Sequence, residues 1–158
     1  MPADLWSFTL DFYARPGVEQ ACLRLQDEGA DVCLLLCGVW LGKRGVACTP
    51  LRVDALVALA GPWQADVVTP LRGLRRQWRA AAQQDSALAD LREQLKTLEL
   101  QAERQLLARL QQLTREWPID EAADVQDWLR TLCGPQACQE HDALQRLCAA
   151  LEHAGGQA

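Results

Sequence analysis

The sequence lacks the short motifs that identify most catalytic and nucleotide-binding proteins. It has no glycine-rich phosphate-binding loop, and no Gly-x-Ser-x-Gly turn of the kind that presents a hydrolase nucleophile. Histidine is scarce, because His141 and His153 are the only two, and no recognisable local motif surrounds any of the seven cysteines. We therefore expect a protein that is not an enzyme and that holds no cofactor.

Long apolar segments and an export signal are also missing. The longest apolar run, residues 32–41, has ten residues, about half of what a transmembrane helix needs. The N-terminus, MPADLWSF, shows no basic region followed by an apolar run. Four of the seven cysteines fall within apolar helical patterns, namely Cys22, Cys33, Cys37 and Cys148. Free thiols without an export signal predict a cytoplasmic protein that does not enter membranes.

Positive charge is in deficit over the chain as a whole, whose formal net charge is −5. Residues 1–79 carry nine Lys and Arg against eight Asp and Glu, whereas residues 80–158 carry seven against thirteen. This balance excludes the broadly basic surface that is typical of nucleic-acid-binding proteins. Any binding of anions must therefore be local.

What the chain does have is the composition of one globular domain. Its 158 residues are 49% hydrophobic and 23% charged, and its six tryptophans favour a packed core or a contact surface. Proline and glycine divide it into segments whose apolar residues recur at helical spacing. We expect helices at about residues 3–14, 18–27, 32–41, 50–60, 70–83, 86–116, 120–133 and 139–153. They predict an all-α, single-domain bundle of seven or eight helices over residues 1–153, with a disordered tail at 154–158.

Several of these helix boundaries rest on specific local signals. Thr49-Pro50 and Thr69-Pro70 each place an N-cap residue before a proline at the first helical position, and Gly61-Pro62-Trp63 separates the two helices that they start. The expected caps of three other helices are Asp31, Asp85 and Asp120. Residues 32–41 are apolar on every side, which predicts a central buried helix that ends at Gly42 and Gly45.

The helices expected at 70–83 and 86–116 predict a long antiparallel hairpin, at about residues 70–116. Both carry apolar residues in steps of three and four along one stripe. A helix of about 30 residues exceeds the common length, so part of it is expected to project beyond the bundle. Leu100 and Leu107 lie off the main stripe and are expected to meet the C-terminal helices, or else a partner helix or a second copy of the chain. The oligomeric state stays open.

Motifs over about two thirds of the chain resemble those of a known family. They are Trp6-x-Phe8, Tyr13, Pro16-Gly17-Val18, Ala21-Cys22-Leu23, Leu25-Gln26-Asp27, Asp31-Val32, Leu34-Leu35-Leu36, Trp40-Leu41, Pro70-Leu71-Arg72, Leu74-Arg75-Arg76 and Ala102-Glu103-Arg104. On these motifs the chain is similar to a gammaproteobacterial family catalogued as domain of unknown function 2390. The resemblance implies a bacterial cytoplasmic protein and transfers no activity. The family pattern has asparagine where this chain has Cys33, so no polar role carries over to that position.

Four arginines, Arg72, Arg75, Arg76 and Arg79, fall on one arc of the helix expected at 70–83. At about 100° per residue, they span an arc of roughly 100°. No acidic residue lies among them, so their mutual repulsion favours a partner that supplies anions. We predict a non-enzymatic binding or regulatory protein that contacts an acidic protein, phosphate or RNA, the last as an RNA- or ribosome-associated factor, through this arginine ridge. Alternatively the four are solvated, or they pair with acids of the adjacent long helix such as Asp90, Glu93 or Glu99.

Two other groups of residues suggest alternative sites. Asp27, Asp31 and Cys33 lie at a junction between expected helices and indicate a small-molecule or diphosphate-handling protein, which predicts an enclosed polar pocket near Asp31. Cys133, Cys138 and His141 are zinc-ligand types, but their spacing is looser than that of structural zinc sites. We therefore expect no metal there. A reversible disulfide across the intervening turn, or plain packing of the thiols, remains the alternative.

Overall fold

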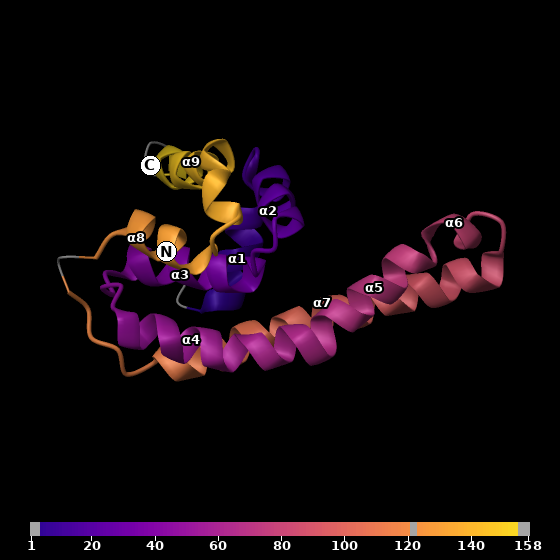
Figure 1. Ribbon diagram of the computed structural model, residues 1–158, viewed down its shortest axis with the longest axis horizontal. Coiled ribbons are helices and arrows are strands. Elements are labelled where there is room, and N and C mark those ends of the chain that lie inside the picture. The colour runs from indigo at the N-terminus through magenta and orange to yellow at the C-terminus, as the bar shows by residue number, and fades with distance from the viewer. Residues whose placement is uncertain (1–3, 121–122, 155–158) are drawn as a thin grey trace.

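The computed structural model describes residues 4–120 and 123–154, with side chains to residue 152, and this part of the chain is helical without strands (Figure 1). The elements are α1 (Leu5–Tyr13), α2 (Val18–Asp27), α3 (Val32–Arg44), α4 (Pro50–Trp63), η1 (Gln64–Val68), α5 (Thr69–Gln77), α6 (Arg79–Ala82), α7 (Ser86–Thr114), α8 (Val125–Leu132), η2 (Ala137–Gln139) and α9 (His141–Ala154). The predicted all-α fold is confirmed. Of the expected disordered tail, residues 155–158 lie outside the described residues.

Helix α3 is the centre of the fold. Every residue from Cys33 to Leu41 is buried, and α3 packs against α1, α7 and α8. The Asp31 carboxylate accepts a hydrogen bond from the Leu34 N–H at 3.2 Å and so caps the helix. The helix ends where Gly45 adopts a left-handed conformation with φ of 89°. The predicted central buried helix is confirmed, although it continues past Gly42 to Arg44.

Helix α8 lies against a face of α3 that has no side chains at two positions one turn apart. A Cβ atom at Gly38 would sit 2.7 Å from Leu132 Cδ1, and one at Gly42 would sit 2.8 Å from the Cα of Val125. These glycines therefore allow the two helices to approach closely. Trp128 of α8 is fully buried at this contact and its indole N–H donates to the Val46 carbonyl at 2.8 Å.

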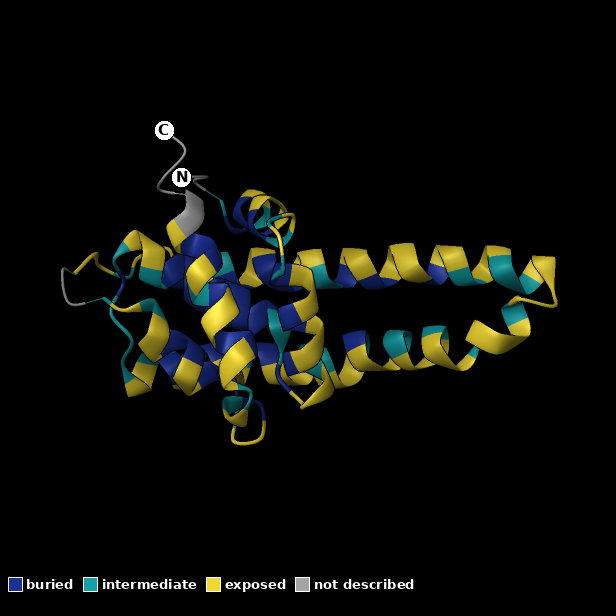
Figure 2. Ribbon diagram, turned by 90° about the horizontal axis from the view of Figure 1, so that it is seen from above, coloured by how far each residue is buried: buried dark blue, intermediate teal, exposed yellow. Residues whose placement is uncertain are grey.

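A long helical arm extends from the body that α1, α2, α3, α8 and α9 form (Figure 1). One side of the arm is formed by α4, η1 and α5 in succession, and the other side by the 29-residue helix α7. Helix α6 lies near the far end. Asp85 caps α7 through a hydrogen bond from the Leu88 N–H, as predicted. The outer half of the arm is mostly exposed (Figure 2). Leu91 and Leu98 of α7 are half exposed. The predicted hairpin and its projection are confirmed.

The expected break at Gly61-Pro62-Trp63 is wrong, because the helix continues through it into η1 and α5. Packing of α4, η1 and α5 along α7 holds the segment helical, and the Trp63 indole N–H donates to the Ala102 carbonyl at 2.9 Å. Thr69 is not an N-cap, since it has helical torsion angles of −60° and −43°. Its N–H instead donates to the carbonyl of Gln64, five residues earlier. This wider turn accommodates Pro70, which has no N–H to donate and whose ring would crowd the carbonyl four residues back.

The Thr49-Pro50 signature, by contrast, caps α4, because the Thr49 hydroxyl accepts from the Arg52 N–H at 3.3 Å. The expected start of a helix at Asp120 is wrong. The N–H of Asp120 donates to the Gly45 carbonyl, and Asp124 caps α8 through the Gln126 N–H at 2.9 Å. The N-cap residue of this helix is therefore Asp124 and not Asp120.

The two glycines of α3 generate a stability prediction. We expect Gly42→Ala to lower the free energy of unfolding by about 1–3 kcal/mol, because the new methyl group meets backbone atoms of α8 that must move. Gly73→Ala is the matched control, since no atom lies within 4 Å of a Cβ placed at this helical position. It should raise stability by about 0.5–1 kcal/mol. Urea denaturation followed by circular dichroism measures both, and equal effects would contradict the close approach of α8.

Candidate functional site

Two of the four arginines predicted to form a ridge point at the long helix α7. Arg72 Nε lies 3.1 Å from Glu99 Oε1 and Arg72 Nη2 lies 3.0 Å from Glu103 Oε1. Arg75 binds the same Glu99 carboxylate through Nε, at 2.5 Å from Oε2, and through Nη2, at 3.3 Å from Oε1. Glu99 is only 6% exposed. These are charge-assisted, partly buried pairs that hold α5 on α7.

The other two arginines lie outside this cluster. Arg76 is well exposed and reaches Asp27 only at 3.9 Å, whereas Arg79 forms no ion pair with any described residue. The structure therefore divides the predicted ridge into an inner pair, Arg72 and Arg75, and an outer pair, Arg76 and Arg79. Of the acids named for the alternative, Glu99 is a partner of the inner pair, and the second partner, Glu103, was not foreseen.

A cavity of about 280 Å³ opens beside the inner pair. Helices α1, α3, α5 and α7, the end of α2 and the π-helical turn η1 surround it, so six separate elements contribute to one site. Its lining residues are Trp6, Thr9, Leu10, Tyr13, Gln26, Ala30, Asp31, Val32, Cys33, Leu36, Gln64, Arg72, Leu100, Glu103 and Leu107. Leu100 and Leu107 thus face α1 and α3 across the cavity rather than the C-terminal helices. A ligand-binding role predicts an enclosed polar pocket near Asp31; a cavity does lie there, but it opens to solvent and its lining is mostly apolar.

Asp31 forms part of the polar wall of this cavity. Its Oδ1 accepts from the Leu34 N–H and, at 2.7 Å, from the Gln64 amide, which the wide turn of η1 presents. Burial raises the pKa of the Asp31 carboxyl to about 6, because these uncharged donors offset only part of the lost hydration. Asp31, Gln64, Gln26 and Arg72 also line a second, more open cavity of about 320 Å³, so the polar groups gather on the wall between the two cavities.

Three polar side chains of the cavity have no hydrogen-bond partner among the described residues. The hydroxyl of Thr9, a residue that is 8% exposed, is buried and unpaired. The Tyr13 hydroxyl and the Gln26 amide also line the cavity and bond to no described group. Buried polar groups in native proteins nearly always have partners, so the Thr9 hydroxyl is an exception. The side chains of Tyr13 and Gln26 are partly exposed, and they offer a bound molecule two polar groups that no described residue occupies.

The charges that face the cavity sum to a negative value. Asp31 and Glu103 are acidic and Arg72 is the single cation. Burial raises the pKa of Glu103, although Arg72 opposes this effect. Arg75 balances the charge of the neighbouring Glu99, and Arg72 balances that of Glu103. The carboxylate without a basic partner is therefore Asp31.

Of the other two residues predicted for a small-molecule site, Cys33 lines the cavity and Asp27 does not. Cys33 lines the cavity as a buried thiol whose pKa burial raises well above its usual value, which makes it unreactive. Asp27 is exposed, contacts Arg76, and does not line the cavity. Sequence reasoning missed Thr9, Tyr13, Gln64 and Glu103. The only local signal was that Thr9 and Tyr13 lie four residues apart and so share one face of α1.

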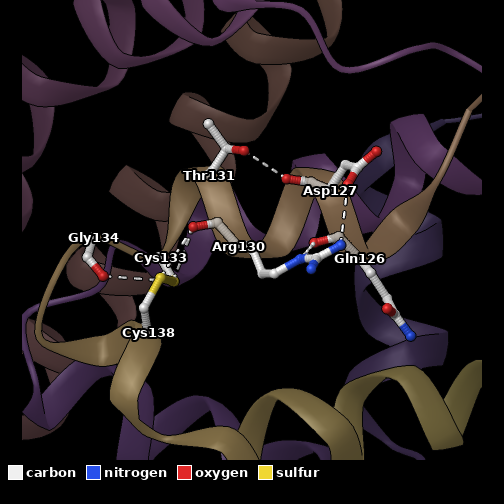
Figure 3. The surroundings of a disulfide bond; sticks show 7 residues. All are labelled: Gln126, Asp127, Arg130, Thr131, Cys133, Gly134 and Cys138. Carbon is white, nitrogen blue, oxygen red and sulfur yellow. Dashed lines mark hydrogen bonds and ion pairs between the residues drawn. A yellow bond between two sulfur atoms is a disulfide. The ribbon is translucent and has the colours of Figure 1, made fainter.

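Cys133 and Cys138 form a disulfide across the turn that joins α8 to η2 (Figure 3). The Cys138 sulfur lies 3.0 Å from the Arg130 carbonyl. A reversible disulfide across this turn was one alternative that the sequence suggested, and plain packing of the two thiols was the other. Over residues 4–120 and 123–152, no group of three or more metal-ligand side chains comes together, and His141 is exposed.

A family model described as "Protein of unknown function (DUF2390)" matches residues 4–110, about two thirds of the chain. The chain belongs to this family. The resemblance expected from the motifs is thereby confirmed, and every residue that lines the cavity lies within the matched segment, whereas the disulfide lies outside it. No curated protein and no solved structure matches.

None of the helices described here combines the length and the apolar composition that a bilayer-crossing segment requires. Helix α3, whose residues from Cys33 to Leu41 are all buried, has 13 residues and is enclosed by the core. Its hydrophobicity is therefore accounted for by packing within the protein.

The unpaired hydroxyl in the cavity leads to a prediction on stability. Thr9→Val keeps the shape of the side chain and removes a buried group without a partner, so it should raise the free energy of unfolding by about 1 kcal/mol. Thr114 is the matched control, because it is equally buried but its hydroxyl donates to the Gln111 carbonyl at 3.0 Å. Thr114→Val should lower stability by a similar amount. Equal losses in both variants, measured by thermal or urea unfolding, would show that the Thr9 hydroxyl already has a partner.

Proposed function

We propose that this protein is a non-enzymatic binding protein that takes a small molecule into the cavity between α1, α3 and α7. The supporting observation is the set of unpartnered polar groups, Thr9, Tyr13 and Gln26, around an open space within a closely packed helical body. Protein interiors normally pack to near-crystalline density and pair their polar groups. A cavity lined by polar side chains without partners suits a ligand that fills the space and bonds to them.

The composition of the lining suits a ligand with an apolar part and a polar end. Leu36 and Leu107 are buried in the cavity, and the half-exposed Leu10 and Leu100 flank its opening to solvent. A mostly apolar pocket with a few converging polar groups is the usual form of a small-molecule site. The surplus of carboxylates over arginine disfavours a diphosphate, because phosphate groups would meet Asp31 and Glu103.

A direct test uses three small probes that share one ring: benzylamine, benzyl alcohol and benzoate. At least one of them should shift the backbone NMR signals of Thr9 and Tyr13 and the indole signal of Trp6 in a saturable way. Leu10→Trp enlarges a side chain at the opening and should weaken that binding at least fivefold, because it narrows the entrance.

The matched control is Leu51→Trp, since Leu51 is 83% exposed on α4 and does not line the cavity. Its binding should equal that of the wild type. If none of the three probes shifts the cavity signals, or if Leu51→Trp weakens binding as much as Leu10→Trp, the cavity is not the binding site and the proposal is overturned.

We also propose, as a second function, contact with an anionic partner through the outer arginines, Arg76 and Arg79. The supporting observation is their position on the projecting arm: Arg76 is 58% exposed in its side chain and Arg79 has no ion pair among the described residues. Arg72 and Arg75 are less available because α7 already supplies their anions. An acidic protein surface is favoured over RNA, since two cations are few for a phosphate backbone.

For this second function, the probes are a fluorescent polyglutamate peptide and a single-stranded RNA of mixed sequence. Arg76→Glu with Arg79→Glu should reduce peptide binding at least tenfold, because each cation is replaced by an anion. Lys96→Glu is the control, as Lys96 lies on the same arm and already pairs with Glu93 at 3.0 Å. Unchanged peptide binding in the double variant would remove the proposal, and RNA binding that falls steeply with salt would replace the protein partner by RNA.

The cellular setting completes the proposal. We infer a bacterial protein that works in the cytoplasm. The resemblance of the sequence motifs supports the first point, and five free cysteines, three of them buried in the core, support the second. In a reducing cytoplasm the Cys133–Cys138 disulfide would be present only transiently.

A further inference from the structure

We infer that the ligand of this cavity is a small organic cation, an amine or amidine joined to an apolar group, whose positive end lies beside Asp31. The inference rests on the proposed small-molecule function and specifies its ligand class. Three independent features of the cavity support it: the charge balance of its lining, the set of donors around Asp31, and the groups that remain open to a ligand.

The first feature is that the only cation of the lining is already engaged. Arg72 directs Nε at Glu99 and Nη2 at Glu103, with distances of 3.1 and 3.0 Å. Two carboxylates already balance the charge of Arg72, so an anionic ligand that bound its Nη1 would add to a surplus of negative charge in the lining. Arg72 therefore serves to neutralise Glu99 and Glu103 and gives the cavity no net positive charge.

The second feature is that Asp31 has no cation in contact with it. Its hydrogen bonds come from uncharged donors, the Leu34 N–H and the Gln64 amide. Arg72 does not bond to it, and burial raises the pKa of this carboxyl to about 6. A ligand cation beside Asp31 would supply the missing opposite charge.

The third feature is the chemistry of the open groups. The Tyr13 hydroxyl and the Gln26 side-chain carbonyl belong to lining residues and can accept hydrogen bonds from the N–H groups of a cation. The ring of Tyr13 also lines the space, and an aromatic face attracts a cation. The apolar part of the ligand would lie against Leu36 and Leu107.

The test compares the affinities of benzylamine, benzyl alcohol and benzoate for the full chain at pH 7 by calorimetry. We expect benzylamine to bind at least tenfold more tightly than benzyl alcohol, and benzoate more weakly than either. Binding of benzyl alcohol or benzoate at least as tight as that of benzylamine overturns the inference but leaves the small-molecule function intact. If no probe binds, the small-molecule function itself fails, and this inference fails with it.

The pH dependence in the wild type provides a check that needs no variant. The carboxyl of Asp31 loses its charge as the pH falls through about 6, whereas benzylamine stays cationic, so its affinity should drop up to about tenfold between pH 7 and pH 5. Benzyl alcohol should show no such drop. The other titratable or charged groups at this wall are Tyr13, Cys33, Arg72, Arg76 and Glu103. A drop of the same size for both probes contradicts the role of Asp31.

Two substitutions test whether Asp31 causes the preference for benzylamine and its pH dependence. Asp31→Asn keeps a good helix cap and an acceptor for Gln64, so the fold should persist, while the preference for benzylamine and its pH dependence should disappear. Asp27→Asn removes the same charge from the same helix junction but outside the cavity, and it should change neither. Equal losses in the two variants would mean that the preference reflects the overall charge of the protein, and the inference would be overturned.

Discussion

The carboxylate of Glu99, held between Arg72 and Arg75, is the interaction on which the site depends. It lies 6% exposed on α7 and receives nitrogen donors from two successive turns of α5. Such a buried, multiply bonded ion pair adds little net stability, but it is costly to disrupt, since each partner would remain charged without a counter-ion. It therefore fixes the register of α5 on α7, and this register brings Arg72 to the cavity and to Glu103.

The π-helical turn η1 has an equivalent role on the other side of the cavity. One additional residue in the turn allows Pro70 to sit within a helix, and it also changes which side chains face α3. Gln64 then lies where its amide reaches Asp31 at 2.7 Å. A backbone irregularity that a helix would usually avoid thus positions a polar group of the site. Wide turns of this type often occur where a helix serves a function.

The helices and the hairpin could be predicted because their causes are local. Apolar spacing marks α3 and α7, and the caps at Thr49 and Asp85 depend only on the residues that follow them. Thr69-Pro70 has the same local signal as Thr49-Pro50, yet packing against α7 overrides it. A pocket near Asp31 was one alternative predicted from the sequence, but its shape and its lining could not be predicted, since the lining residues come from six elements and no local pattern encodes a gap in the packing. Asp31 was found because its position at a helix junction is local, whereas its contact with Gln64 is not.

The close contact of α3 with α8 has a consequence for how the chain folds as it is made. Gly38 and Gly42 leave a face of the central helix without side chains, and Trp128 of α8 covers this face and bonds to Val46, 82 residues earlier in the chain. Until α8 has left the ribosome, this face of the central helix has no cover. Contacts of such long sequence separation slow folding. The nascent N-terminal two thirds contains every residue that lines the cavity, yet it exposes this apolar face until the end of synthesis, which favours aggregation of the incomplete chain.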